Sequence, residues 1–271
     1  MKLLDVVEAC NQRIPHSKTW RGMRGESYGP YLNGSSNKEI WRVLFSVTQS
    51  QAIERYAQQM HYDLTISHHP SRGEALPHLV YHTALDCCEG GLNDMWADAI
   101  GMSCHGTFDE NLGAMGKVEA IAFKDLVAKC LGFAGDIRGF VTPGKDADMV
   151  RRVVICTGLG GMVLRDVERF KPDVYITGQL YGNPYDSSIP HIIEVGHTLS
   201  ERCGVKVFQD LLVPHDVVVD SAPLRMDVFG SECVGQVADY RKTLGPSVWG
   251  PAGETVRIAE GIVNQSQGEQ V

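Results

Sequence analysis

The residues best suited to chemistry are histidines placed where apolar segments end. His68 and His69 stand side by side between the β-branched segment 63–67 and Pro70. Neighbouring residues of a regular strand point to opposite faces, but at a strand end before a proline the two imidazoles can turn toward two nearby ions. Taken alone, an adjacent histidine pair is more often a solvated or helix-capping pair in a loop. Further ligands are needed before the pair indicates a metal site.

A second group follows the next apolar segment, residues 78–82. His82 ends that segment and Asp86 comes four residues later. A carboxylate after a strand end can bridge two cations because it carries two oxygens. The alternative for Asp86 is a turn or cap residue ahead of the glycines at 90 and 91.

A third group lies on a segment expected to be helical. His197 and Glu201 are four residues apart, so both side chains lie on one helical face and can reach a common point. This spacing is half of the HExxH zinc motif, and surface helices also produce such pairs by chance.

Together these groups offer one ligand chemistry, imidazole and carboxylate without thiolate. That composition suits Zn, Fe, Mn, Co or Ni, and five ligands with two carboxylates exceed the needs of one tetrahedral ion. Two divalent ions per chain, sharing the carboxylates, would use the whole set. The candidate ligands are His68, His69, Asp86, His197 and Glu201. The pair Cys87 and Cys88 is a weaker alternative for a soft metal, because no other cysteine completes a thiolate set.

A glycine-rich turn also needs an interpretation. The segment 153–166, VICTGLGGMVLRDV, reads as a strand, a turn and a helix. It contains no GK[ST], and Val163 at the sixth position breaks the GxGxxG pattern, so neither phosphate fingerprint applies. The default is a tight strand-to-helix turn. The alternative is an anion site at the helix N-terminus.

The elements that must position these residues alternate along the chain. Hydrophobic periodicity predicts helices over 2–13, 51–60, 92–101, 123–132 (closed by Gly132) and 162–170, and helical pieces over 191–212. It predicts strands at 41–47, 63–67, 78–82, 137–141, 151–157, 173–177 and 216–222. This alternation predicts an α/β protein with a mainly parallel or mixed sheet.

Composition narrows the class of protein. The net charge of −8 and the absence of any Lys/Arg-rich run make nucleic acid an unlikely partner. The N-terminal segment lacks the apolar core of a signal peptide, and the longest apolar run, 153–164, is too short to span a bilayer. Eight cysteines without a CxxC pair fit reduced thiols. We therefore expect a cytoplasmic protein that does not bind membranes.

Six short motifs, in order, resemble one family. They are Ser-His-His-Pro at 67–70, His-Thr-Ala-Leu-Asp at 82–86, Gly-Gly-Leu-Asn-Asp at 90–94, Gly-Leu-Gly-Gly at 158–161, Asp-Val-Tyr-Ile-Thr-Gly at 173–178 and Gly-His-Thr-Leu-Ser-Glu at 196–201. The chain is similar, from about residue 40 to about 212, to the Nif-three-like dinuclear metal centre family, whose members are often named GTP cyclohydrolase type 2 homologues.

The resemblance implies an architecture and a ligand set. It implies two interlinked α/β domains around a dinuclear metal cleft, assembled into a toroidal homohexamer. The metal-binding domain would comprise 1–112 and 190–271, and the second domain 113–189. The family's ligands fall on the five residues named above, with His82 as a weaker ligand or a residue that supports one. This chain departs from the family at Gln179, where an acidic residue is usual, and that change bears on substrate recognition.

The function that follows is metal-dependent hydrolysis of a small nucleotide, a phosphoester or a cyclic amide. The alternative is a non-catalytic hexameric scaffold that binds metal for storage or delivery, or that regulates a partner.

Overall fold

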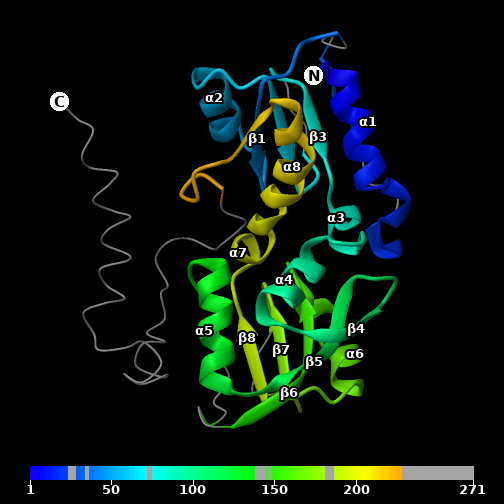
Figure 1. The fold of residues 1–271 in the computed structure, drawn as a ribbon, viewed down its shortest axis with the longest axis vertical. Coiled ribbons are helices and arrows are strands. Elements are labelled where there is room, and N and C mark those ends of the chain that lie inside the picture. The colour runs from blue at the N-terminus through cyan, green and yellow to red at the C-terminus, as the bar shows by residue number, and fades with distance from the viewer. Residues whose placement is uncertain are drawn as a thin grey trace, which may run out of the picture.

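The computed structural model describes residues 1–23, 29–33, 37–71, 75–137, 145, 148–180 and 186–227, apart from the side chains at 104 and 105. The chain forms two β-sheets with helices packed on both faces (Figure 1). One sheet has four strands in the order β3-β2-β1-β9, and the other has five in the order β4-β5-β6-β7-β8. The prediction of an α/β protein with a mixed sheet is confirmed. In the described part of the chain, the helices are too short or too polar to cross a bilayer.

The four-stranded sheet is parallel throughout. Its strands are β1 (Arg42–Ser46), β2 (Leu64–Ser67), β3 (His78–Val80) and β9 (Val218–Ser221). The helices α1 (Leu3–Arg13) and α8 (Val205–Leu212) pack on one face, and α2 (Gln51–Gln59) packs on the other. Because helices cover both faces, β2 and β3 are buried along their whole length and show no alternation of polar and apolar residues.

The first helix shows how sequence spacing sets this packing. Leu3, Val6 and Cys10 recur at helical spacing and are all completely buried. They belong to one apolar cluster with Phe208 and Leu212 of α8. Burial of each large aliphatic side chain stabilises the fold by about 1.5–3 kcal/mol before the loss of chain entropy is counted.

The five-stranded sheet is mixed. The strands β4 (Ser103–Phe108), β5 (Gly113–Ala122) and β6 (Met149–Cys156) pair antiparallel, and β7 (Val174–Thr177) and β8 (His191–Glu194) continue parallel to β6. The helices α4 (Leu92–Ile100) and α5 (Phe123–Ala134) pack on one face, and α6 (Leu164–Arg169) packs on the other.

This sheet extends beyond the range 113–189 predicted for a second domain, because β4 and β8 are bonded into it. The division of the chain into domains stays a prediction.

Two local predictions were wrong, and one strand pair was missed. The helix predicted to close at Gly132 runs on to Ala134 and ends at Gly135, which has the left-handed conformation (φ 80°) that favours glycine. Residues 191–194 form β8 and not a helix, because a short apolar run buried in a sheet has no helical period to show. The antiparallel pair β4–β5 was not predicted, because scattered glycines and a bulged register obscure its alternation. Most of the strand predicted at 137–141 lies outside the described residues.

Two short helices, α3 (Thr83–Cys87) and α7 (His197–Glu201), lie between the two sheets (Figure 1). The Trp96 indole N–H donates to the main-chain oxygen of Ser200 at 2.8 Å, which ties α4 to α7. The main-chain N–H of Thr157 donates to Asn93 Oδ1 at 3.0 Å, which ties the end of β6 to α4. All segments that carry a predicted ligand therefore meet in this junction.

Candidate metal centre

The histidine pair is held in place by the end of the first sheet. The N–H of His68 donates to Ser46 O at 3.0 Å, and the N–H of His69 donates to Val47 O at 2.8 Å. Parallel pairing with β1 thus continues for two residues past β2. The two rings lie with centroids 5.1 Å apart and planes at 54°, so both reach the junction although they are neighbours in sequence.

Glu201 lies at the centre of the cluster. Its Oε1 is 3.3 Å from His68 Nε2 and 3.2 Å from His197 Nε2. Its Oε2 is 3.1 Å from His69 Nε2. The Nε2 atoms of His69 and His197 are 3.2 Å apart. All four side chains are buried. The structure therefore brings together these four predicted residues, although they come from two different sheets.

These spacings suit the ligands of a metal ion. Ligand atoms at about 2.1 Å from a common ion lie roughly 3.0–3.4 Å apart for octahedral to tetrahedral angles. Two groups of ligand atoms lie within 4.8 Å of one another, His68 with His69 and His82, and His69 with His197 and Glu201. The chain's own residues fit one ion in each group.

The far nitrogens of two rings determine which tautomer faces the cluster. His68 Nδ1 lies 3.2 Å from the main-chain oxygen of Tyr81, and His197 Nδ1 lies 3.0 Å from Gln179 Oε1. Carbonyl oxygens only accept, so each Nδ1 carries a proton, and the Nε2 of each ring faces Glu201. Such outer partners fix the orientation of metal-binding histidines.

Two buried polar atoms without hydrogen-bond partners also indicate a metal site. His68 Nε2 and Glu201 Oε2 make no hydrogen bond to the residues that the structure describes. Buried polar atoms are nearly always bonded, so two unpaired atoms in one cluster indicate a missing ligand.

The pKa values of the clustered side chains favour a cation beside the carboxylates. Burial opposes ionisation of Glu201, but the three histidines outweigh it and hold its pKa well below the ordinary value. Burial disfavours the charged form of His68, yet the carboxylates of Glu201 and Asp86 raise its pKa to about 9. Burial raises the pKa of Asp86 to about 6 and lowers that of His69. Near neutral pH and without a metal ion, the ionised Glu201 carboxylate therefore faces a protonated His68 imidazole.

Asp86 and His82 lie at the margin of the cluster. Asp86 Oδ2 is 3.6 Å from His68 Nε2, while its Oδ1 accepts the Thr157 hydroxyl at 2.9 Å. His82 is half-buried at the start of α3, with its ring centroid 5.1 Å from that of His68 and 5.5 Å from that of His69. Both residues can join the set by small side-chain rotations.

The glycine-rich turn lets the backbone approach the cluster. Gly158 has φ 62°, and a Cβ placed on it would lie 2.2 Å from Glu201 Oε1 and 3.4 Å from His197 Nε2. The N–H of Gly158 donates to Ser200 Oγ at 2.9 Å, which joins this turn to α7. These contacts favour the tight-turn interpretation of residues 158–161 over an anion site.

Sequence reasoning missed two residues that hold the site, Thr48 and Thr157. Thr48 Oγ1 lies 2.7 Å from His69 Nδ1, and Thr157 donates to Asp86 as described above. Thr48 follows the predicted strand 41–47 and Thr157 ends the predicted strand 151–157, so a search for polar residues at every strand end would have found them.

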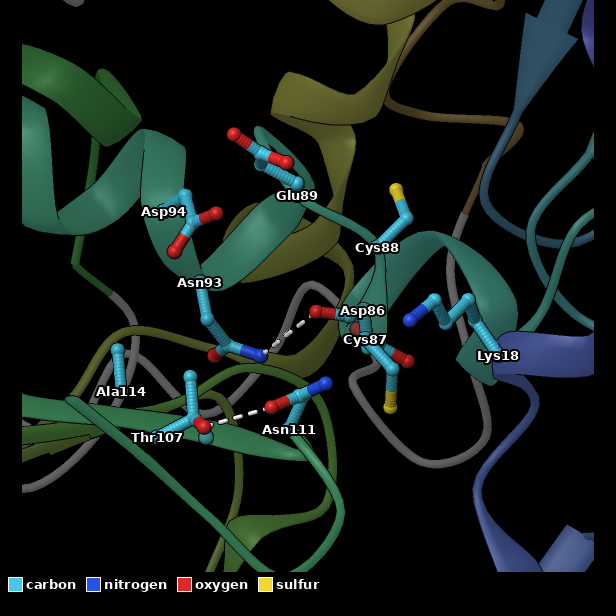
Figure 2. Close-up of a pocket in the computed structure, with 11 residues that line it drawn as sticks. Lys18, Asp86, Cys87, Cys88, Glu89, Asn93, Asp94, Thr107, Asn111 and Ala114 are labelled. Carbon is cyan, nitrogen blue, oxygen red and sulfur yellow. Dashed lines mark hydrogen bonds between the residues drawn. The ribbon is translucent and has the colours of Figure 1, made fainter. Parts of the chain in front are cut away.

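Two cavities meet at Asp86. A cavity of about 400 Å³ is lined by His69, His82, Asp86, His197 and Glu201 and by mostly apolar walls. A second, of about 340 Å³, lies on the other side of α3 and is lined by polar groups that include Lys18, Glu89, Asp94 and Asn111 (Figure 2). In Figure 2 the Asn93 amide points toward Asp86, whose main-chain oxygen accepts from it at 3.2 Å. Cys87 and Cys88 line only the second cavity.

Comparison with known proteins agrees with this fold. The chain is 27% identical over 214 residues to a "GTP cyclohydrolase 1 type 2 homolog" of Lactococcus lactis, covering 69% of this chain and 83% of that protein. The structure of reduced HcgD from Methanocaldococcus jannaschii superposes with a TM-score of 0.70 at 20% identity, covering 82% of this chain and 97% of that one. A Bacillus cereus protein related to NIF3 superposes with a TM-score of 0.68 at 16% identity, covering 85% and 99%.

The family described as Duf34/NIF3 (NGG1p interacting factor 3) matches residues 73–221, more than half of the chain. That range contains Asp86, His197 and Glu201 together with the helices α3 and α7 that carry them. The chain belongs to the Duf34/NIF3 family.

Proposed function

We propose that this protein binds divalent metal ions in the junction between its two sheets. The observation that carries the proposal is the convergence of three imidazole Nε2 atoms on both oxygens of the buried Glu201, at 3.1–3.3 Å. His68 Nε2 and Glu201 Oε2 make no hydrogen bond there to the described residues, although buried polar atoms are nearly always bonded. A cation between the ligands removes both deficits.

Two ions use the ligand set better than one. His69, His197 and Glu201 form one group of ligand atoms. His68, His69 and His82 form the other, and Asp86 lies beside it. Two carboxylates would balance half of the four positive charges of two divalent ions, and such partial compensation is what a buried cation site needs.

The reaction class we propose is hydrolysis of a small molecule. A pair of divalent ions, when bound, supplies Lewis acidity that brings the pKa of water toward neutrality and polarises a carbonyl or phosphoryl bond. The chain's own contribution is positioning. Tyr81 and Gln179 hold the rings of His68 and His197, and the apolar walls keep bulk water away from the ligands.

The walls of the 400 Å³ cavity favour one of the three predicted substrate classes. Among its described lining residues, Trp20, Met23, Leu112, Leu159 and Met162 are apolar, no Lys or Arg occurs, and the two carboxylates are ligands. A triphosphate would need cationic partners in addition to the metals. We therefore place an uncharged cyclic amide ahead of a phosphoester or a nucleotide such as the GTP in the relatives' name.

Metal content tests the site first. Elemental analysis of purified protein should give about two divalent ions per chain, and His68→Ala or His197→Ala should lower this to one or none. His215→Ala is the matched control, because His215 is an exposed histidine outside the cluster. Full metal content in both ligand variants would refute the assignment.

Turnover tests the reaction. A panel of cyclic amides, phosphodiesters and nucleotides should reveal an activity that the His69→Ala variant lacks. Metal binding without turnover of any compound supports the non-catalytic alternative of storage, delivery or regulation. The homohexamer remains a proposal drawn from the family, and sedimentation equilibrium measures it directly.

A further inference from the structure

Asp227, near the end of the described chain, lies completely buried against the end of β1. Its Oδ2 accepts the main-chain N–H of Val47 at 2.8 Å, and its Oδ1 accepts that of Thr48 at 2.9 Å. Both oxygens are thus used to fix two consecutive peptide groups. Hydrogen bonds to an ionised carboxylate are roughly twice as strong as neutral ones, so the turn after β1 has one well-defined position.

That turn holds one of the candidate ligands. Thr48 Oγ1 lies 2.7 Å from His69 Nδ1, and the N–H of His69 donates to Val47 O at 2.8 Å. The same two residues that Asp227 fixes therefore fix both the backbone and the ring of His69. When Nδ1 donates to the threonine oxygen, Nε2 is left unprotonated and faces Glu201 and His197.

A second connection runs from Asp227 to α7. Arg202 follows Glu201 directly, and its Nη1 lies 3.9 Å from Asp227 Oδ2. Its Nη2 donates to the main-chain oxygen of Ala222, in the segment that leads to Asp227. A buried carboxylate is costly unless it is paired and bonded. Asp227 is bonded to Thr48, which contacts His69, and lies near Arg202, which follows Glu201.

We propose that Asp227 is a positioning residue of the metal centre, which sets the placement of His69 through Thr48. The inference rests on the proposed metal centre. Its rival is that Asp227 only stabilises the end of β1 and has no effect on the ligand. The two differ in what happens to the His69 ring in protein that remains folded.

The first experiment needs no metal. Imidazole ¹⁵N shifts of the metal-free protein at pH 8 should show a His69 Nδ1 that is hydrogen-bonded to the Thr48 hydroxyl. Thr48→Ser keeps the hydroxyl and should keep this Nδ1 shift, whereas the isosteric Thr48→Val should move it toward the value of an unbonded nitrogen. Asp227→Asn should also move it, because an amide cannot accept two N–H bonds with the same geometry and Thr48 then loses its fixed position.

The second experiment measures affinity for Zn²⁺ by competition with a chromophoric chelator. Thr48→Val and Asp227→Asn should each bind about 10- to 100-fold more weakly, the usual effect of removing an outer partner of a metal ligand. Asp220→Asn is the matched control, since Asp220 lies on the same segment but contacts Tyr62 and Arg42. It should bind as the wild type does.

The outcomes separate the proposals. A wild-type Nδ1 shift and wild-type affinity in folded Asp227→Asn would overturn the positioning role, and so would an unchanged His69 Nδ1 shift in Thr48→Val. If Asp227→Asn fails to fold, the double variant Asp227→Asn/Arg202→Gln, which leaves no uncompensated buried charge, decides by the same two readouts. If the wild type binds no Zn²⁺, the proposed function fails, while the ¹⁵N result still stands or falls on its own.

Discussion

Replacing Gly158 with alanine should disable the metal centre without touching a ligand. The added Cβ would lie 2.2 Å from Glu201 Oε1. An ordinary contact needs about 3.3 Å or more, so the carboxylate must retreat by roughly 1 Å. Productive metal geometry tolerates displacements of about 0.5 Å. Glu201 would therefore lose its place among the three imidazoles, and we expect metal affinity to fall at least 100-fold.

A second cost arises in the backbone. Gly158 has φ 62°, a conformation that costs alanine roughly 1–2 kcal/mol. Gly135→Ala isolates this cost, because Gly135 has φ 80° and nothing lies within 4 Å of the new Cβ. Gly132→Ala removes both effects, since Gly132 lies inside α5 with nothing within 4 Å, and it should stabilise the helix by up to about 1 kcal/mol.

The assay combines urea unfolding of the three metal-free variants with the chelator competition. Gly135→Ala and Gly132→Ala should bind metal as the wild type does, whatever their stability. Gly158→Ala should lose affinity by more than its loss of stability explains. Wild-type affinity in folded Gly158→Ala would show that Glu201 does not ligate from its observed position.

Three further predictions concern other groups. Gln179→Glu should make the Nε2 of His197 more basic and raise metal affinity by up to about tenfold. Where turnover is found, the change should also alter the pH–rate profile. Weaker metal binding would contradict this. All eight thiols should react in denaturant without reductant, because the six described cysteines are unpaired; fewer than six reactive thiols would count against it. Burial lowers the pKa of His78 from 6.5 to about 4. The unfolded chain therefore takes up a proton first, and stability that is complete above pH 6.5 should fall by about 3 kcal/mol toward pH 4. His78→Gln should lack that part of the slope in pH-dependent unfolding.

The sequence brought out the candidate ligands more readily than the residues that surround them. His68, His197 and Glu201 could be named because they stand at a strand end and at helical spacing, within motifs that resemble one family. Gly158 and Thr48 could not, because their roles depend on how closely two distant segments approach. Their contacts to Glu201 and His69 exist only after both sheets are packed.

The same limit explains the errors in the elements. β8 was read as part of a helical stretch because its apolar run is four residues long and gives no period by itself. The pairing of β4 with β5 was missed because a strand is stabilised by its neighbour, which the local sequence does not contain. By contrast, α1 has its own amphipathic pattern and was predicted within a residue of its observed bounds.

The place of β9 has a consequence for biosynthesis. β9 lies beside β1, with Val43 opposite Val219, so the first and last described strands are neighbours. On the ribosome, all five strands of the other sheet emerge between them. β1 must keep an open edge during that time, and open edges invite pairing with other nascent chains. The histidine pair is likewise synthesised well before α7. A partial chain offers imidazoles without Glu201, and it acquires the full ligand set only once residue 201 has been made. The proposed metal centre would therefore load late, after synthesis of most of the chain.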